Sequence, residues 1–280
     1  MQPAVHGVEA TITGLASVLR TAAAIAPPTA AVCALAGVGE AKTSATIEAG
    51  LRARGITFPV AIVGDVLAAA AAGLADGPGV LLWSGTGSFA IARDAAGVLH
   101  RVGGRGYLLG DQGSGYDLVR RAAAAVLLAA DDLGPPTALT GALTAAFQAP
   151  APPRLGAVLQ RLAPGDVAAQ LPVVLATAAA GDAVAHEVLQ DGAEALVGLA
   201  SAAVRKAGLD WRALPVAVGG GVLGQAPAVL ELVGERLRAL GAAAPRGIAP
   251  RAAAVGAAWL AMGWHQRQSP QQEWVARVAL

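Results

Sequence analysis

The segment from residue 80 to residue 117 constrains the fold most, because two glycine-rich turns flank a hairpin pattern within it. An apolar run, Val80 to Trp83, leads into the first turn, which has the sequence SGTGS at residues 84–88. Alternating residues over 89–102 predict a β-hairpin, and the second turn, GDQGSG, follows at residues 110–115. Glycine lets backbone N–H groups approach an anion closely, and successive N–H groups form a concave phosphate site. The segment therefore predicts a strand, a candidate anion-binding turn, a hairpin and a second turn that opens a helix.

The first turn also fits a dinucleotide-binding fingerprint, since Gly85, Gly87 and Ala90 match G-x-G-x-x-A after a strand. That fingerprint requires a helix directly after the turn, so that the pyrophosphate meets the helix N-terminus. A strand pattern follows Gly87 instead, which disfavours this fold. A dehydrogenase stays open only if a helix follows Gly87, and ordinary structural turns are the other alternative.

Composition excludes several other classes of protein. Of 280 residues, 55% are hydrophobic, which argues against disorder, and the net charge of +1 provides no field that would recruit nucleic acid or anionic lipid. Cys33 is the only cysteine, so no intramolecular disulfide and no CxxC metal site is expected, and the four histidines show no metal-ligand spacing. The sequence predicts no nucleic-acid partner and no protein-bound metal cluster.

The hydropathy pattern predicts a cytoplasmic protein with no membrane partner. The longest strongly apolar stretch, Val66 to Ala75, ends at Asp76 and is shorter than the about 18 residues that a membrane span needs. The N-terminal sequence has no basic region followed by an apolar core, so we do not expect a signal peptide.

Strands alternate with helices along the first part of the chain, which predicts a parallel α/β topology. Apolar strands are expected at residues 29–36, 59–63 and 80–83, and helices at 7–25, 44–54 and 66–74. Ligands in such folds bind at the carboxyl ends of the strands, where Asp65 lies. Asp65 could cap the next helix, or it could act as a general base that accepts the proton of a hydroxyl group.

The second part of the chain is mostly helical, with one further strand. Ser114 and Asp117 have capping-box spacing at the start of a helix that ends near residue 130, whose free N–H groups are expected to point toward Asp111. Helices are expected at 137–148, 154–162, 171–180, 182–207, 227–240 and 250–262. The strand at 214–222 runs into three glycines, which permit close approach of a flat ligand or simply make a tight turn.

The combination of SGTGS, a hairpin, GGRG and LLGDQGSGY resembles the BadF/BadG/BcrA/BcrD ATPase family, from about Val5 to Met262. This family includes N-acetylglucosamine kinases and belongs to the actin-like, hexokinase-like and Hsp70-like ATPase superfamily. The resemblance implies a two-domain α/β fold of the ribonuclease H-like, actin-like type. The expected first domain is 1–88, with a helix at 250–264 packing back on it. The expected second domain is 89–249 with a helical insertion, and a tail is expected at 265–280.

The resemblance also implies an ATP-dependent kinase that phosphorylates N-acetylglucosamine or a related amino sugar, with ATP and Mg²⁺ as cofactors and a homodimer as a candidate assembly. Asp65 resembles the family's catalytic base and would also contact the sugar. The other substrate-binding residues would be Gly37 and Asp111. The nucleotide-binding residues would be Gly85, Thr86, Gly87 and Ser88 at the phosphates and Gly219, Gly220 and Gly221 beside adenosine.

The family opens with a strand–turn–strand whose Asp-Gly-Gly-Gly-Thr-like motif grips the outer phosphates and organises Mg²⁺. This sequence has no such motif, and its start, QPAVHGVEATITGL, resembles the segment that comes after the motif. We therefore expect the first domain to be truncated by roughly forty residues. The alternative function is a truncated, non-catalytic sugar- or nucleotide-binding relative. An ATPase that activates a dehydratase is disfavoured, because that branch carries cysteines for a bridging iron–sulfur cluster.

Overall fold

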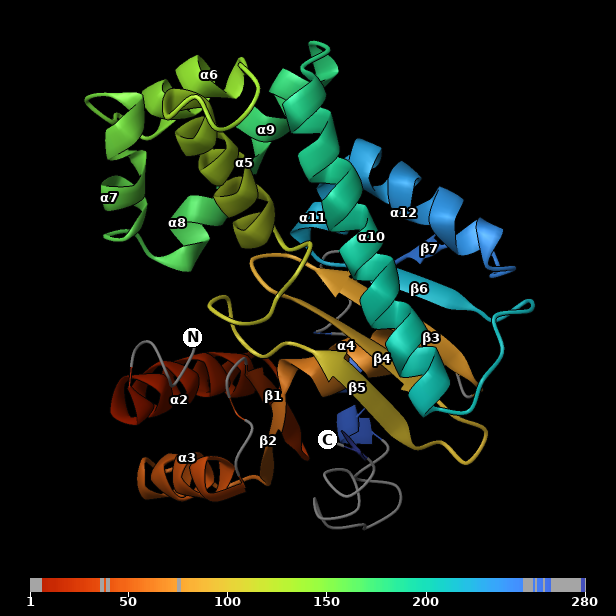
Figure 1. The fold of residues 1–280 in the computed structure, drawn as a ribbon. Helices are drawn as coiled ribbons and strands as arrows, with labels where there is room; N and C mark the ends of the chain where they lie inside the picture. The colour runs from red at the N-terminus through yellow and green to blue at the C-terminus, as the bar shows by residue number, and fades with distance from the viewer. Residues whose placement is uncertain are drawn as a thin grey trace. The chain divides into compact units, whose positions relative to one another are not determined.

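The computed structural model describes residues 7–35, 38, 41–74, 77–248, 254, 256–258, 260–262, 278 and 279. The chain divides into two compact units, residues 1–75 with 251–278, and residues 76–250 with 279–280 (Figure 1). The boundary between the units thus falls after Ala75, whereas the sequence placed it after Ser88. The difference arises because the strand before the first glycine turn pairs with strands of the second unit. Most of the expected tail, 265–280, lies outside the described residues.

The first unit contains a two-stranded parallel sheet and the helices around it. Its elements are α2 (Val8–Ile25), β1 (Ala31–Leu35), α3 (Ala41–Ala53), β2 (Val60–Gly64) and α4 (Asp65–Gly73). The strands pair in register from Ala31 opposite Val60 to Leu35 opposite Gly64. All five elements confirm the predicted strand–helix alternation.

Among the described residues of the first unit, two clusters of apolar side chains pack its elements together. In one, α2 contributes Ile12 and Leu15, which pack with Ile47 of α3 and Ile62 of β2. In the other, Ala257 and Leu260 pack with Val63 and Ala68, so the helical residues near 260 belong to this unit. Of the helices that the structure describes, only α2 has the length and composition of a membrane span, a test that helices of soluble cores also pass.

The second unit is built on a mixed sheet with the strand order β7-β6-β3-β4-β5-β8. β3 pairs antiparallel with β4 and parallel with β6. The strands of this unit are β3 (Gly79–Ser84), β4 (Ser88–Arg93), β5 (Leu99–Gly103), β6 (Val216–Gly219) and β7 (Arg246–Gly247), and β8 (Val278–Ala279) falls where the residue ranges of the two units meet. Because β4 directly follows Gly87, the hairpin prediction is confirmed and the dinucleotide-binding alternative is excluded.

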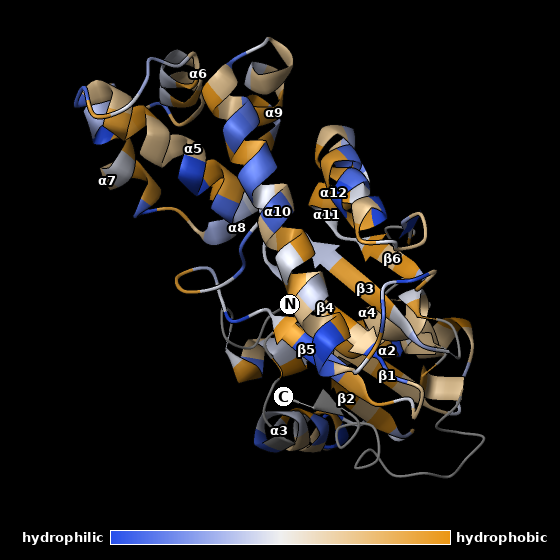
Figure 2. Ribbon diagram, turned by 45° about the vertical axis from the view of Figure 1, so that its right-hand side comes forward, coloured by the Kyte–Doolittle hydropathy of each residue, from blue (hydrophilic) through white to orange (hydrophobic). Residues whose placement is uncertain are grey.

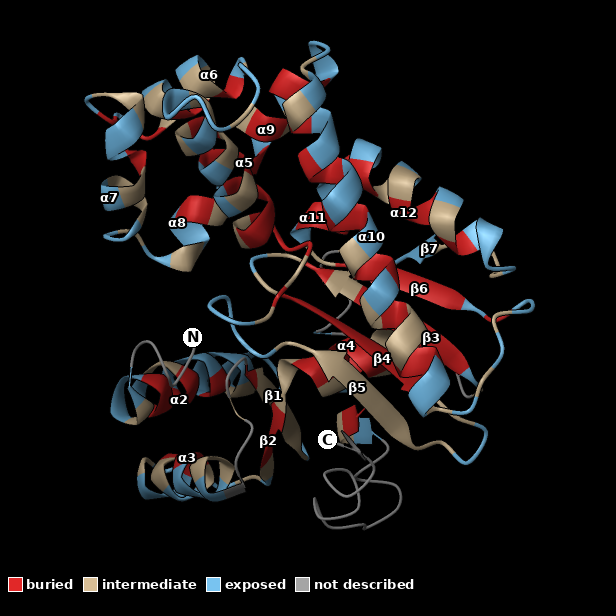
Figure 3. Cartoon of the chain, viewed as in Figure 1, coloured by how far each residue is buried: buried red, intermediate tan, exposed pale blue. Residues whose placement is uncertain are grey.

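Nearly every residue of β3, β4 and β6 is buried (Figure 3), and these strands are strongly hydrophobic (Figure 2). The long helix α10 (Ala183–Lys206) packs across β3, β4 and β5 (Figure 1). The remaining helices are α5 (Gly115–Ala130), α6 (Leu139–Ala146), η1 (Pro152–Arg154), α7 (Leu155–Leu159), α8 (Pro164–Ala168), α9 (Leu171–Ala179), α11 (Gly221–Gln225) and α12 (Pro227–Ala239).

The helical insertion differs from its prediction in the proline-rich stretch. The single helix predicted at 154–162 is a 3₁₀ turn followed by the short α7, and an unpredicted helix, α8, begins at Pro164. Proline is well suited to the first position of a helix, which is where Pro164 lies.

Asp182 joins the insertion to α10. One of its carboxylate oxygens, Oδ1, accepts a hydrogen bond from the Ala185 amide at 2.8 Å, and Oδ2 accepts one from the Ala138 amide at 2.7 Å. Burial would raise the pKa of Asp182, but the Ala185 and Ala138 amides and the Thr137 hydroxyl lower it below its usual value. A single carboxylate thereby holds the starts of α6 and α10 together.

Candidate functional site

The glycine-rich turn of residues 84–88 and that of residues 219–221 lie side by side, at the carboxyl ends of two neighbouring strands of the second unit. β3 and β6 are parallel neighbours, with Trp83 opposite Gly219, so their carboxyl ends bring residues 84–88 next to 219–221. At Gly220 an added Cβ would lie 2.3 Å from the carbonyl oxygen of Ser84. Only glycine fits this approach, and the φ of 91° at Gly220 also favours glycine.

The second turn, which leads into α5, is bonded directly to the first. The Gly115 amide donates to the carbonyl oxygen of Gly85 at 2.8 Å. The hydroxyl of Ser84 donates to the carbonyl oxygen of Gly113 at 2.8 Å, and that of Ser88 to the carbonyl oxygen of Gln112 at 2.7 Å. The two turns that the sequence placed around one hairpin therefore form one structure.

Asp111 is the buried carboxylate of this structure. Its side chain approaches Gly87, where an added Cβ would lie 2.7 Å from its Oδ2, and its backbone has a φ of 58°. The residue is 8% exposed, and its Oδ1 has no hydrogen-bond partner among the described residues. Burial raises the pKa of Asp111, against the Ser88 and Gly106 amides and the charge of Arg101, which act to lower it. An unpaired, buried carboxylate oxygen is costly, which indicates a place for a hydrogen-bond donor or a hydrated cation.

The tip of the first turn, at Thr86 and Gly87, carries hydrogen-bond donors. Within the described part of the chain, no acceptor pairs with the amides of Thr86 and Gly87 or with the hydroxyl of Thr86, and Thr86 is exposed. Two successive amides and a hydroxyl suit an anion such as a phosphate group. Ser88 differs from its prediction, because it is 1% exposed and its hydroxyl is bonded to Gln112. Its observed contact braces the second turn.

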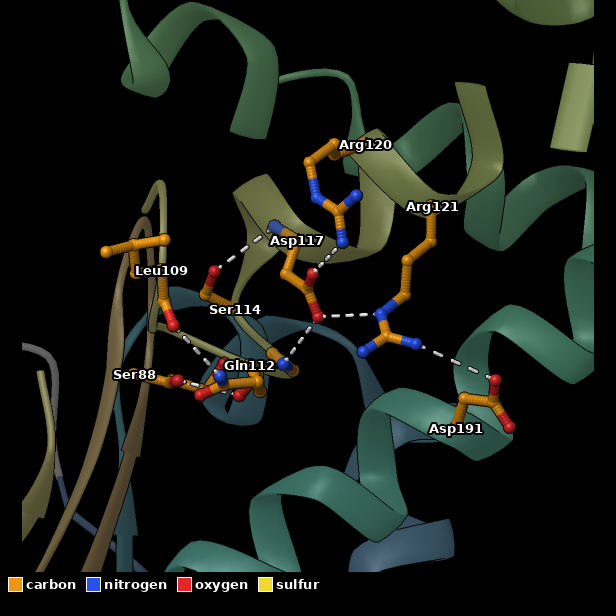
Figure 4. A network of polar contacts seen from close by, with 10 residues as sticks. Ser88, Leu109, Gln112, Ser114, Asp117, Arg120, Arg121 and Asp191 are labelled. Atoms are coloured by element: carbon orange, nitrogen blue, oxygen red, sulfur yellow. Dashed lines mark hydrogen bonds and ion pairs between the residues drawn. The ribbon is translucent and has the colours of Figure 1, made fainter. Parts of the chain in front are cut away.

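Four amides at and just before the start of α5 are bonded within the protein, whereas the prediction had free amides here. The Gly113 amide donates to Asp117, and the Ser114 amide donates to the carbonyl oxygen of Asp111. The Gly115 amide bonds Gly85, and the Asp117 amide bonds the Ser114 hydroxyl at 3.2 Å (Figure 4). The predicted cap on Ser114 is thus confirmed, but these four donors are used within the protein and do not face a ligand.

The three glycines at the end of β6 divide into two kinds. An added Cβ at Gly219 would lie 2.7 Å from the ring of Trp83, so Gly219, like Gly220, is required by packing. Gly221 is exposed and has no atom within 4 Å of an added Cβ. Of this turn, Gly221 has the open surroundings that a ligand contact would need.

Asp65 lies in the first unit, at the carboxyl end of β2, where the sequence predicted it. It is the first residue of α4, and its Oδ1 accepts the Val66 amide at 2.9 Å. Its side chain is half-buried. Gly37, the other candidate from this part of the chain, lies outside the described residues.

Comparison with known sequences gives one family and two named relatives. The model of the BadF/BadG/BcrA/BcrD ATPase family matches residues 4–261. Over 196 residues the chain is 29% identical to the N-acetylmuramic acid/N-acetylglucosamine kinase of Clostridium acetobutylicum, covering 69% of this chain and 64% of that protein. Over 135 residues it is 36% identical to the N-acetyl-D-glucosamine kinase of Dictyostelium discoideum, covering 47% of this chain and 42% of that protein. The chain therefore spans less than two thirds of the length of either relative.

Solved structures show the same fold. A protein from Chromobacterium violaceum assigned as an N-acetylglucosamine kinase superposes with a TM-score of 0.71 at 26% identity, covering 91% of this chain and 84% of that one. A protein from Porphyromonas gingivalis with the same assignment superposes with a TM-score of 0.73 at 18% identity, covering 96% and 89%. The predicted ribonuclease H-like, actin-like fold is confirmed. With the fold in agreement and the family model matching nearly all of its length, the chain belongs to the BadF/BadG/BcrA/BcrD ATPase family.

Proposed function

We propose that this chain is an ATP-dependent kinase that phosphorylates an amino sugar, N-acetylglucosamine or a close relative of it. One observation supports this most. The unused donors of Thr86 and Gly87 lie on a turn that also contacts Asp111, whose buried Oδ1 lacks a partner among the described residues. Donors for an anion beside an acceptor for a hydroxyl group suit a reaction between a phosphate and an alcohol. The names of the two sequence relatives agree with this class of reaction.

In this proposal each residue has a separate task. Thr86 and Gly87 bind phosphate oxygens of ATP, and Gly221 lies beside the nucleotide. Asp111 accepts a hydrogen bond from a sugar hydroxyl or holds Mg²⁺ through water, since Mg²⁺ is usually bound by one or two carboxylates together with substrate phosphates. Bound Mg²⁺ would neutralise charge that develops on the phosphates. Asp65 accepts the proton of the attacking hydroxyl group.

The direct test is calorimetry with ATP·Mg²⁺ and with N-acetylglucosamine, combined with an assay for sugar phosphate. We expect both ligands to bind and phosphate to be transferred. Thr86→Ala should weaken nucleotide binding by about tenfold, the usual effect of losing a hydrogen bond to a charged group. The matched control is Thr13→Ala, an exposed threonine of α2 whose hydroxyl bonds Glu9, and it should change nothing. Sugar binding without nucleotide binding would favour the non-catalytic alternative, and binding of neither ligand would overturn the proposal.

The substitution Asp111→Asn should raise the stability of the protein at neutral pH and lower its affinity for the sugar. Because the pKa of Asp111 is raised in the folded protein, stability is lost as pH rises from the ordinary value of 3.8 through the folded-state value. Asparagine removes the ionised form, so the variant should unfold at a higher temperature than the parent at neutral pH and at the same temperature well below pH 3.8. Sugar affinity should fall by about tenfold or more, because a charged acceptor is lost. Thermal unfolding at both pH values and sugar titration check these results. Unchanged sugar affinity would exclude the contact with the sugar, and unchanged affinity for both sugar and ATP·Mg²⁺ would remove Asp111 from the site.

A further inference from the structure

Asp117 is the centre of a polar network in the first turn of α5. Its side chain is buried, and its Oδ2 accepts the Gly113 amide at 2.9 Å and the Nε of Arg121 at 2.8 Å. Its Oδ1 accepts Nη2 of Arg120 at 2.8 Å, and Arg121 reaches on to Asp191 of α10 at 3.7 Å (Figure 4). The sequence pattern suggested only a helix cap here, so this carboxylate has more partners than a cap requires.

The network leads through the backbone to Asp111. Gly113 is held through both of its backbone polar groups. Its amide donates to the Asp117 carboxylate, and its carbonyl oxygen accepts a hydrogen bond from the hydroxyl of Ser84. The next amide, that of Ser114, donates to the carbonyl oxygen of Asp111 at 3.1 Å. Two bonded steps therefore connect the Asp117 carboxylate to the backbone of Asp111.

Only glycine fits at position 113 of this turn. The φ of Gly113 is 74°, and an added Cβ would lie 2.4 Å from the carbonyl oxygen of Gly192 in α10. Asp111 itself has a left-handed backbone, which costs a residue other than glycine about 1 kcal/mol or more. Such a conformation persists only where the surroundings hold it in place.

The partners of the Asp117 carboxylate are all hydrogen-bond donors, and two of them are cationic, so they favour its ionised form. Burial would raise the pKa of this carboxyl, but the Gly113 amide and the guanidinium groups of Arg120 and Arg121 hold it below its usual range, so the group is ionised. Hydrogen bonds to an ionised acceptor are shorter and stronger than neutral ones. Removing the charge would leave Gly113 with a weaker acceptor.

We propose that Asp117 is a positioning residue, which fixes the turn of residues 111–114 and so keeps the buried oxygen of Asp111 directed at the sugar. The link to the sugar rests on the function proposed above. Asp117 touches no substrate in this scheme and acts through the Gly113 amide and the backbone of Asp111. Among the described residues, Thr86 and Gly221 form no hydrogen bond with residues 111–114, so we expect the KM for ATP to change much less than the KM for sugar.

The test compares Asp117→Asn with a matched control in the full chain. Asp182→Asn changes another carboxylate that accepts helix-starting amides, but its partners are Ala138 and Ala185 at the insertion. Both variants lose hydrogen bonds to a charged acceptor, so both should lose thermal stability. The discriminating measurements are amide hydrogen exchange over residues 111–116 and the separate KM values for sugar and for ATP.

For Asp117→Asn we expect exchange at residues 111–116 and the KM for sugar each to rise by about tenfold or more, with the KM for ATP within about twofold. Asp182→Asn should speed exchange only near Ala138 and Ala185 and leave both KM values unchanged. Unchanged exchange at 111–116 in Asp117→Asn overturns the proposal. So does an equal rise of both KM values, because that would mean a general loss of structure. If the parent chain phosphorylates no sugar, the proposed function fails, and hydrogen exchange with sugar titration by calorimetry still decides whether Asp117 positions the turn.

Discussion

Replacing Gly220 with alanine is expected to cost about 3 kcal/mol or more of folding free energy, because overpacking and a left-handed backbone each cost about 1–3 kcal/mol. The new Cβ would lie 2.3 Å from the oxygen and 2.5 Å from the carbon of the Ser84 carbonyl group. These are backbone atoms at the end of β3, which pairs with β4 on one side and β6 on the other, so they have no room to withdraw. Chemical denaturation of parent and variant measures the loss.

The matched control is Gly224→Ala, a few residues along the same segment. Gly224 lies in α11, and an added Cβ there would have no atom within 4 Å. Alanine is favoured over glycine inside a helix by about 1 kcal/mol, so the control should be neutral or slightly stabilising. A Gly220→Ala protein within about 1 kcal/mol of the parent would contradict the close approach of the two turns.

Asp65→Asn is expected to lower the turnover of the proposed kinase by about 10²–10⁴-fold, the usual contribution of a general base. Asparagine keeps an oxygen that can accept the Val66 amide, now bonded at 2.9 Å, so α4 should start as before. Binding of ATP and sugar should change by no more than about threefold, because the lost proton acceptor acts in the transition state. Steady-state kinetics and calorimetry on the same preparations separate the two effects.

Asp210→Asn is the control for this substitution. Asp210 is an exposed carboxylate whose Oδ1 accepts the Arg212 amide at 2.8 Å, a comparable local contact to the amide two residues on. Its turnover should equal that of the parent. A loss of less than about tenfold in Asp65→Asn would mean that another group accepts the proton.

The elements of the site were predictable where the signal was local. The glycines of residues 84–88 and 219–221 and the alternation along β4 and β5 are visible in the sequence, and the structure has a turn or a strand at each. Ser114 was predicted to cap α5, and it does, since its hydroxyl accepts the Asp117 amide. These features depend on neighbours only a few residues away.

Contacts between distant segments could not be predicted in the same way. Ser84 and Ser88 looked like members of an anion-binding turn, yet their hydroxyls bond the carbonyl groups of Gly113 and Gln112. The Asp117 carboxylate was expected to complete a cap, and it instead bonds Gly113 and two arginines. The unit boundary fell after Ala75 because β3 pairs with β6, which no local pattern announces.

The pairing of β3 with β6 also determines when the sheet can be completed while the chain is being synthesised. β3, β4 and β5 leave the ribosome as a complete antiparallel meander, but the parallel neighbour of β3 begins only at Val216. Until then one edge of β3 has no partner strand. Closing the long loop between β3 and β6 is slow compared with forming the meander of β3, β4 and β5. That edge of β3 therefore stays without its partner strand until the insertion and α10 have been made, and unpaired strand edges are prone to aggregation.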